Sequence, residues 1–167
     1  MKVKLERCFF YDVHLDEAQL RSQCPSAQVE GAGRLENHVL AFGGRHHYET
    51  MDEEIIDTPA RANALPSPGE AVRGTMCRVS LEDLDGLERL ERHQGRGTGY
   101  FRCGKMVRDA AGTMRRAQVF LHEPSMFSQR IPSMSYLQQM GCAYERLGFG
   151  QWPLWRAAEK AIVEGAK

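Results

Sequence analysis

The sequence predicts a single α+β domain, and three observations lead to this fold class. Runs of β-branched and aromatic residues recur between clusters of Gly, Pro and Asp, as is typical of strands. Segments with helical spacing or N-terminal caps lie between and after these runs. The 167 residues suit one domain, which would bury roughly two-thirds of its unfolded surface.

The strands are expected mainly in the first three-quarters of the chain. The double run around residues 28–43 is expected to form two strands, with a break between them at Glu36. The expected strands cover about residues 3–12, 28–35, 37–43, 70–80, 100–108 and 114–122.

Helices are predicted from their starts and from spacing. Ser80 can cap a helix, with the acidic Asp83 three residues later. Ser133 and Pro153 mark two further starts, through a side-chain cap and a preset φ respectively. The expected helices cover about residues 16–23, 81–92, 133–147 and 153–164, and an apolar stripe is expected on the second at Leu81, Leu84, Leu87 and Leu90.

Composition places the chain among ordinary globular proteins. Its 22 basic and 22 acidic residues balance, so net charge does not indicate nucleic acid or an anionic membrane as partner, although a local basic patch stays open. No apolar run approaches the ~20 residues of a membrane span. Five cysteines without a CxxC pair favour reduced thiols, packed as small hydrophobes inside a cell. With no secretory signal at Met1–Arg7, we expect a cytoplasmic protein, and an organelle interior such as the mitochondrial matrix is the alternative.

A polar excursion is expected between Gly44 and Ala64. It holds His46 and His47, followed by acidic residues, and this invites a metal hypothesis. Adjacent side chains point apart on a strand and about 100° apart on a helix, so the two histidines are awkward to place on one ion. We therefore expect a surface loop or a partner contact there, and no metal site.

Five ordered segments resemble the gamma-glutamyl cyclotransferase-like family, from about Lys2 to Leu154. The first follows the opening strand, where members have Tyr-Gly-Ser/Thr and this chain has Tyr-Asp-Val. The resemblance implies a small mixed β-barrel with flanking helices. The five segments are residues 9–15, 25–43, 62–74, 87–102 and 132–143. The second resembles a hairpin of the family that ends in the "Leu-Ala-Phe-Gly" run, here at 40–43, and the third holds the "Asn-x-x-Pro-x-Pro-Gly" run at 63–69.

The resemblance also implies a reaction. The free α-amine of a gamma-glutamyl group attacks its own side-chain carbonyl, closes 5-oxoproline and releases the attached amine. In active relatives one glutamate moves the proton and the loop after the first strand cradles the substrate, so a base and backbone N–H donors are required. Neither a cofactor nor a metal is implied.

This chain departs from the pattern at the glutamate. Aligning residues 87–95 on Leu-x-x-Leu-Asp-x-x-Glu-Gly places Gln94 at the catalytic position. An amide is too weak a base to replace a carboxylate. The loss of a positioned base corresponds to ~10²–10⁴ in rate, or roughly 3–5 kcal/mol of barrier.

The loop departs as well. Asp12 stands where glycine would allow a close backbone approach, and its charge would oppose a substrate carboxylate by about 1–4 kcal/mol at ~4 Å. Val13 lacks the hydroxyl of Ser or Thr. These two changes and Gln94 alter opposite walls of the implied pocket.

Three compensations remain open. A shifted alignment, Leu84-x-x-Leu87-Glu88-x-x-Glu91, puts Glu91 in the catalytic column. Asp12 could act as a relocated base, and His14 or His93 could carry protons near pH 7. The vestigial substrate pocket is expected to comprise Tyr11, Asp12, Val13, His14, Leu15, Gln94, Tyr100 and Tyr136.

Two functions from different classes follow from the resemblance. The favoured one is a catalytically inactive cyclotransferase-like domain, residues 1–152, that serves as a binding or structural subunit of a larger assembly with protein partners. Residues 153–167 are expected to form a C-terminal helical tail, with Trp155, Ile162 and Val163 as contact candidates, and the alternative is a helix packed on its own barrel. The alternative is an active gamma-glutamyl or gamma-glutamylamine cyclotransferase with a rearranged site and a small gamma-glutamyl ligand.

Overall fold

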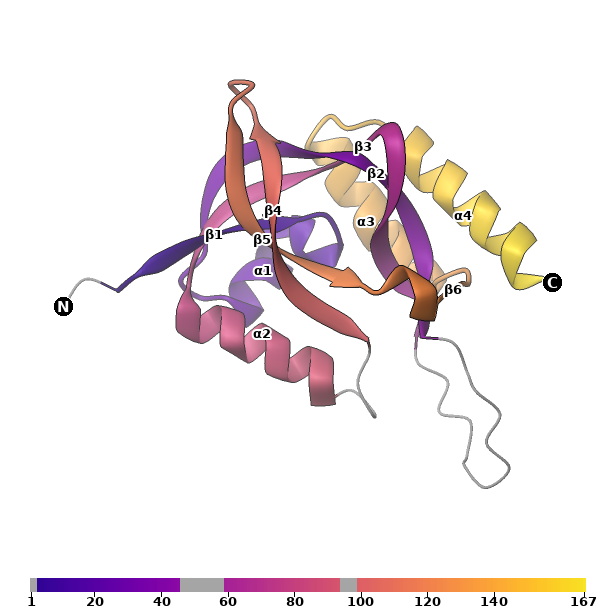
Figure 1. Cartoon of the computed structure of the whole chain (residues 1–167), viewed down its shortest axis with the longest axis horizontal. Coiled ribbons are helices and arrows are strands. Elements are labelled where there is room, and N and C mark those ends of the chain that lie inside the picture. Colours follow the sequence, from indigo (N-terminus) through magenta and orange to yellow (C-terminus); the bar gives the residue numbers. More distant parts are fainter. Residues whose placement is uncertain (1–2, 46–58, 94–98) are drawn as a thin grey trace.

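A computed structural model describes residues 3–45, 59–93 and 99–167 (Figure 1). The strands are β1 (Leu5–Phe10), β2 (Gln28–Arg45), β3 (Arg61–Ser80), β4 (Tyr100–Asp109), β5 (Met114–His122) and β6 (Phe127–Gln129). The α-helices are α1 (Glu17–Gln23), α2 (Leu81–His93), α3 (Met134–Arg146) and α4 (Trp152–Gly165), with short 3-10 turns η1 (Val13–Leu15) and η2 (Pro124–Met126). The predicted α+β class is confirmed.

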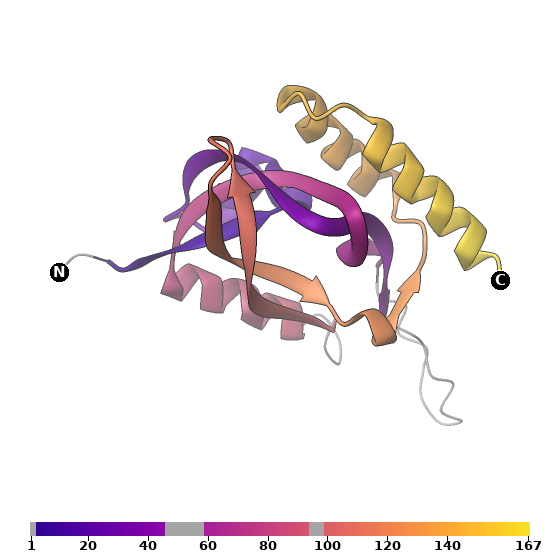
Figure 2. The same cartoon turned by 45° about the horizontal axis from the view of Figure 1, so that its top comes forward.

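The strands close into a mixed barrel. Their order is β3-β1-β5-β4-β2-β6, and β3 also pairs with β2, which joins the two ends of the first five strands. The β1–β5 contact is parallel and the other pairings are antiparallel. Helices α1 and α2 lie beside one side of the barrel, while α3 and α4 lie side by side on another (Figures 1 and 2).

The expected hairpin at residues 28–43 is wrong, because β2 is one continuous strand that pairs along β3. Asn37 takes a left-handed φ of 58°, and its side chain accepts a hydrogen bond from Gly69 N at 3.1 Å. This bond spans a register shift between β2 and β3. The expected break between two strands is therefore a bulge within β2. The partner strand β3 begins at Arg61, well before the expected residue 70.

The predicted helices are confirmed to within about two residues, and two of their starts are confirmed in detail. Ser80 Oγ accepts from Asp83 N at 3.2 Å, and Ser133 Oγ accepts from Tyr136 N at 3.2 Å. The carboxylate of Asp83 instead accepts from the backbone N–H and the hydroxyl of Ser26. This contact ties the start of α2 to the segment before β2.

The leucine stripe on α2 is only half right. Leu84 and Leu87 are buried, whereas Leu81 and Leu90 are about half exposed. A spacing of three residues drifts around a helix with 3.6 residues per turn, so the ends of the stripe rotate outwards. The inward face continues from Leu87 to the residue four positions on, which is Glu91.

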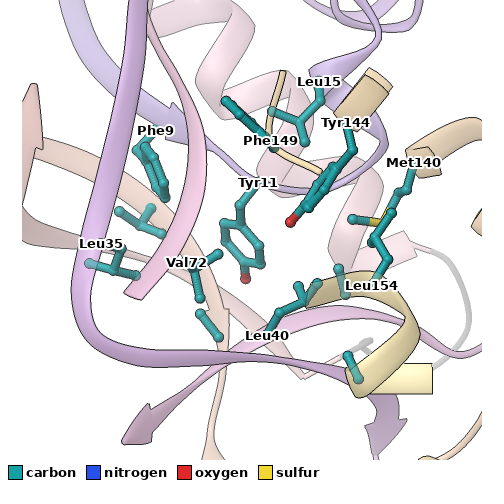
Figure 3. Close-up of a cluster of buried hydrophobic side chains, with 14 of the residues drawn as sticks. Phe9, Tyr11, Leu15, Leu35, Leu40, Val72, Met140, Tyr144, Phe149 and Leu154 are labelled. Carbon is teal, nitrogen blue, oxygen red and sulfur yellow. The ribbon is translucent and has the colours of Figure 1, made fainter. Parts of the chain in front are cut away.

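Two hydrophobic clusters stabilise the fold. The smaller one packs β1 and β3 against α1 and α2, around Cys8, Phe10 and Leu20. The larger one fills the barrel and extends under α3 and α4, as Figure 3 shows. Buried α4 residues in this larger cluster are Leu154, Ala157, Ala158 and Ala161.

All five cysteines are free thiols, with Cys8, Cys24 and Cys77 buried and Cys142 exposed. Within residues 3–45, 59–93 and 99–167, no three His, Cys, Asp or Glu side chains gather as metal ligands do. No helix in those ranges has the length and apolar character needed to cross a bilayer. His46 and His47 lie outside the described residues.

Close strand packing predicts opposite effects for two Gly→Ala changes. A Cβ at Gly74 would come within 2.2 Å of Phe10 O, and this backbone atom can move aside only if the strand shifts. We therefore expect Gly74→Ala to lower the free energy of unfolding by about 2–4 kcal/mol. A Cβ at Gly86 in α2 meets only Arg89 Nη2 at 3.9 Å, so Gly86→Ala should raise stability by about 0.5–1 kcal/mol. Urea denaturation measures both, and equal effects of the two variants would contradict this account.

Candidate active site

A small pocket lies where the end of β1, the start of β3 and the inner face of α2 meet. Its volume is about 20 Å³, which is room for about one water molecule. Three of its polar side chains come from distant parts of the sequence, namely Asp12, Arg61 and Glu91. The other lining residues are Phe9, Phe10, Tyr11, His14, Ala62, Leu87, Tyr100 and Phe120.

The Asp12 side chain is hydrogen-bonded within the loop that follows β1. Asp12 has an extended backbone, with φ of −110°, so the chain needs no glycine conformation here. Its Oδ1 accepts from the backbone N of His14 at 2.9 Å and lies 2.7 Å from His14 Nδ1. The carboxylate thus caps η1 and occupies a backbone donor of this loop.

His14 is held between two acceptors. Nδ1 faces Asp12 Oδ1, and Nε2 lies 2.6 Å from Gln23 Oε1. With Asp12 and Gln23 Oε1 as the two acceptors, both ring nitrogens donate, as they do in the protonated imidazolium. Burial alone would lower the pKa of His14, but the charge of Asp12 and the hydrogen bonds to Asp12 and Gln23 outweigh it and raise the pKa to about 9.

The same pairing acts on the carboxyl group. Burial would raise the pKa of Asp12, yet the charge and hydrogen bonds of His14 lower it below its usual value. At pH 7 the pair is therefore an ion pair. Neither member titrates near neutrality, as a general base or proton carrier needs to do.

Arg61 and Glu91 form a second ion pair across the pocket. Arg61 Nη1 donates to Glu91 Oε1 at 2.9 Å and to Oε2 at 2.8 Å. Both side chains are mostly buried, with exposed fractions of 24% and 18%. The helical spacing described above carries Glu91 inwards, four residues after Leu87.

Three tyrosine hydroxyls are bonded to backbone at or near the pocket. Tyr11 donates to Phe120 O at 2.6 Å, and Tyr100 donates to Ala62 O at 2.7 Å. Tyr136 accepts from Ala62 N at 2.9 Å. Burial raises the pKa of all three far above the ordinary tyrosine value. These hydroxyls therefore stay neutral and fix the geometry of β3 and β5.

The structure brings together part of the predicted site. Tyr11, Asp12, His14, Tyr100 and the fallback base Glu91 line the pocket. Tyr136 touches it only through Ala62, while Val13 and Leu15 pack on the larger hydrophobic cluster. Gln94 lies outside the described residues.

Sequence reasoning missed Arg61. The residue stands one position before the Ala62–Gly74 segment that carried the family resemblance, within the polar excursion expected between Gly44 and Ala64. In the sequence Arg61 is only a positive charge at the start of a strand, and this does not identify the residue that it pairs with. Gln23 was missed for a similar reason, because only the fold brings α1 against η1.

Comparison with known proteins identifies the fold. No family model matches the chain, and no curated protein matches it. A solved gamma-glutamyl cyclotransferase superposes with a TM-score of 0.75 at 18% identity, covering 92% of this chain and 86% of that one. An uncharacterized protein from Homo sapiens gives 0.73 at 19% identity, with the same coverage of 92% and 86%.

A third structure, YkqA from Bacillus subtilis, gives a TM-score of 0.64 at 16% identity and covers 86% of this chain but 49% of its own. At these identities the likeness concerns the fold. The chain has the fold of gamma-glutamyl cyclotransferase.

Proposed function

We propose that this chain is a non-catalytic protein that keeps the gamma-glutamyl cyclotransferase fold for binding, as a subunit of a larger assembly. The observation that carries the proposal is the occupation of the pocket by the chain's own charges. The Asp12 carboxylate accepts a hydrogen bond from the His14 backbone N–H, and Arg61 donates to both carboxylate oxygens of Glu91. The pocket left between them holds about 20 Å³.

Each requirement of the cyclization argues against turnover in this arrangement. A gamma-glutamyl group needs backbone donors for its negative charge, and here a side-chain carboxylate already accepts from one of them. It needs a base for its ammonium, and the pocket's carboxylates are both held in ion pairs. Gln94, at the position implied by the resemblance, is an amide.

The outer faces of α3 and α4 support a binding role. Large apolar side chains are exposed there, including Met134 at 65%, Trp155 at 62% and Ile162 at 55%. They line a groove of about 810 Å³. Its two charged lining residues, Glu145 and Glu159, are both acidic, and neither forms an ion pair with any residue that the structure describes. We infer a partner segment that is an amphipathic helix with basic flanks.

A second candidate function is an active cyclotransferase, favoured by the position of Glu91 in the pocket. If Arg61 turned to the substrate carboxylate, Glu91 could take a proton from the α-ammonium. The freed amine would attack the side-chain carbonyl carbon, and Glu91 would return the proton to the leaving nitrogen as the carbon–nitrogen bond breaks. The ring nitrogen would lose its second proton to Glu91 as well, and Glu91 would pass it to the released amine, which leaves as an ammonium ion, so the step needs no cofactor.

Turnover assays separate the two candidates. We expect pure protein to form no 5-oxoproline from a panel of gamma-glutamyl amino acids and amines, measured by mass spectrometry. Combining Asp12→Gly with Gln94→Glu should create activity, because it restores a free loop donor and a carboxylate worth ~10²–10⁴ in rate. Wild-type turnover that Glu91→Gln abolishes, while the matched change Glu88→Gln spares it, would overturn the proposal.

The Asp12–His14 pair predicts a pH dependence of stability. The folded pKa of His14 is raised from 6.5 to about 9, so its stabilisation is complete below pH 6.5 and is lost as pH rises through 9. The total is on the order of 3 kcal/mol. Asp12→Asn should remove this slope, whereas His38→Gln, a change at a histidine outside the pocket, should keep it. Urea denaturation between pH 6 and about 9 measures the slopes, and identical profiles for all three proteins would contradict the pairing.

The groove between α3 and α4 predicts a selective loss of partner binding. Ile162→Asp places a charge in the groove, whereas Val163→Asp places one on the same helix, at the same 55% exposure, outside it. We expect tagged wild type and Val163→Asp to co-elute with a partner in size-exclusion chromatography of cell extract, and Ile162→Asp to elute alone. A wild-type protein that elutes only as a free monomer would count against the assembly role.

A further inference from the structure

Three arginines lie side by side on the outer surface of the barrel. Arg34 in β2 is directly paired with Arg73 in β3 and with Arg108 in β4. Directly paired residues of antiparallel strands project from the same face, with Cα atoms about 4.5–5.5 Å apart. Like charges in such positions repel each other and destabilise the sheet. Arg108 is ion-paired with Glu36, so the uncompensated repulsion is that between Arg34 and Arg73, and a bound anion would offset it.

Arg34 and Arg73 form one wall of a groove whose other wall is α4. The groove has a volume of about 300 Å³ and is lined by four basic side chains, from Arg34, Arg73, Arg156 and Lys160, against one carboxylate, Glu70. It shares no residue with the pocket at Asp12 and Glu91.

Most of this positive charge is not neutralised within the chain. Glu70 is engaged by Arg156 and Ser67, and Glu36 neutralises Arg108. Among residues 3–45, 59–93 and 99–167, no carboxylate forms an ion pair with the remaining cations of the groove, Arg34, Arg73 and Lys160. Net charge near zero thus conceals a local basic site.

Two aromatic residues lie beside these cations: Phe149 contacts Arg73, and Trp152 lines the groove itself. The guanidinium carbon of Arg73 lies 4.6 Å from the centre of the Phe149 ring, a cation–π contact that positions the charge. Trp152 lines the groove with 71% of its surface exposed. An exposed indole beside unpaired cations is the arrangement on which nucleic-acid bases stack while their phosphates are neutralised.

We propose that this groove binds a nucleotide unit, with the phosphate held by Arg34, Arg73 and Lys160 and the base stacked on Trp152. The nucleotide is either free or part of a single strand, and both sources share this chemistry. A phosphate placed there relieves the repulsion between the paired arginines, so binding should also stabilise the fold.

Intrinsic fluorescence tests the site directly. The chain has two tryptophans, so Trp155→Phe leaves Trp152 as the single indole reporter. The probes are adenosine monophosphate and a ten-nucleotide oligoadenylate. We expect saturable quenching by at least one of them. For the oligonucleotide, the logarithm of the binding constant plotted against the logarithm of the salt concentration should have a slope of about −2, the value for about three phosphate contacts on a single strand.

The two probes distinguish the sources. Saturation by the monophosphate at a concentration similar to that of the oligonucleotide indicates a free nucleotide as ligand. Saturation by the oligonucleotide alone indicates a single strand, and either result supports the site. Absence of saturable quenching by both probes at millimolar concentration and low salt would overturn it.

Matched variants separate this groove from general surface charge. Arg34→Gln and Arg73→Gln should each weaken oligonucleotide binding about fivefold and make the salt slope shallower by about 0.7. Arg116→Gln is the control, because Arg116 is an exposed arginine on β5 outside the groove. Equal losses in all three variants would show nonspecific attraction and contradict the proposal.

The stacking contribution is tested by fluorescence anisotropy of a labelled oligonucleotide. Trp152→Ala should weaken binding at least fivefold, since stacking on one base contributes ~1–3 kcal/mol. Trp155→Ala, on the α4 face that lines the other groove, should leave binding unchanged. Circular dichroism confirms folding of each variant, and an unaffected Trp152→Ala protein would refute the stacking role.

Discussion

The fold depends on one constraint, the closure of the barrel by β3. This strand pairs with β2 from Arg61 to Arg78 and with β1 from Thr75 to Ser80, so its C-terminal part is hydrogen-bonded on both edges. A closed sheet leaves few exposed edges, and its interior must be filled by side chains. Because β3 starts beside the pocket and ends at α2, closure also brings Arg61 within reach of Glu91.

Two ion pairs meet at the pocket. Within each pair, the buried charge of one residue is stable only because the opposite charge of its partner is present. Removing charges from water costs several kcal/mol per ion, which a paired and hydrogen-bonded geometry offsets. Deleting one member would leave its partner buried without compensation, and that is more costly than losing the pair. His14 and Glu91 are also coupled electrostatically, since Glu91 contributes to the raised pKa of His14. The pocket is thus a single electrostatic unit, built from loops and elements that are distant in sequence.

Local signals in the sequence were enough for most of the fold, because caps and turns act over a few residues. Ser80 and Ser133 start helices as expected. Local signals failed at Asn37, where a turn residue serves a bulge, since the choice between hairpin and continuous strand depends on pairing with β3. They also failed at Arg61 and Gln23, whose partners lie 30 and 9 residues away and are chosen by the tertiary fold.

Tyr11 illustrates how a residue of the presumed substrate pocket can serve another purpose. β1 and β5 meet through a single pair, Cys8 and Gln118, which is the sparsest seam of the barrel. The Tyr11 hydroxyl bonds Phe120 O across that seam, and its ring packs in the barrel core beside Phe9 (Figure 3). Barrel closure is therefore a sufficient reason for a tyrosine at this position, whether or not the pocket turns over a substrate. In this chain Tyr11 is a structural clasp between β1 and β5, and its presence alone does not indicate an enzyme.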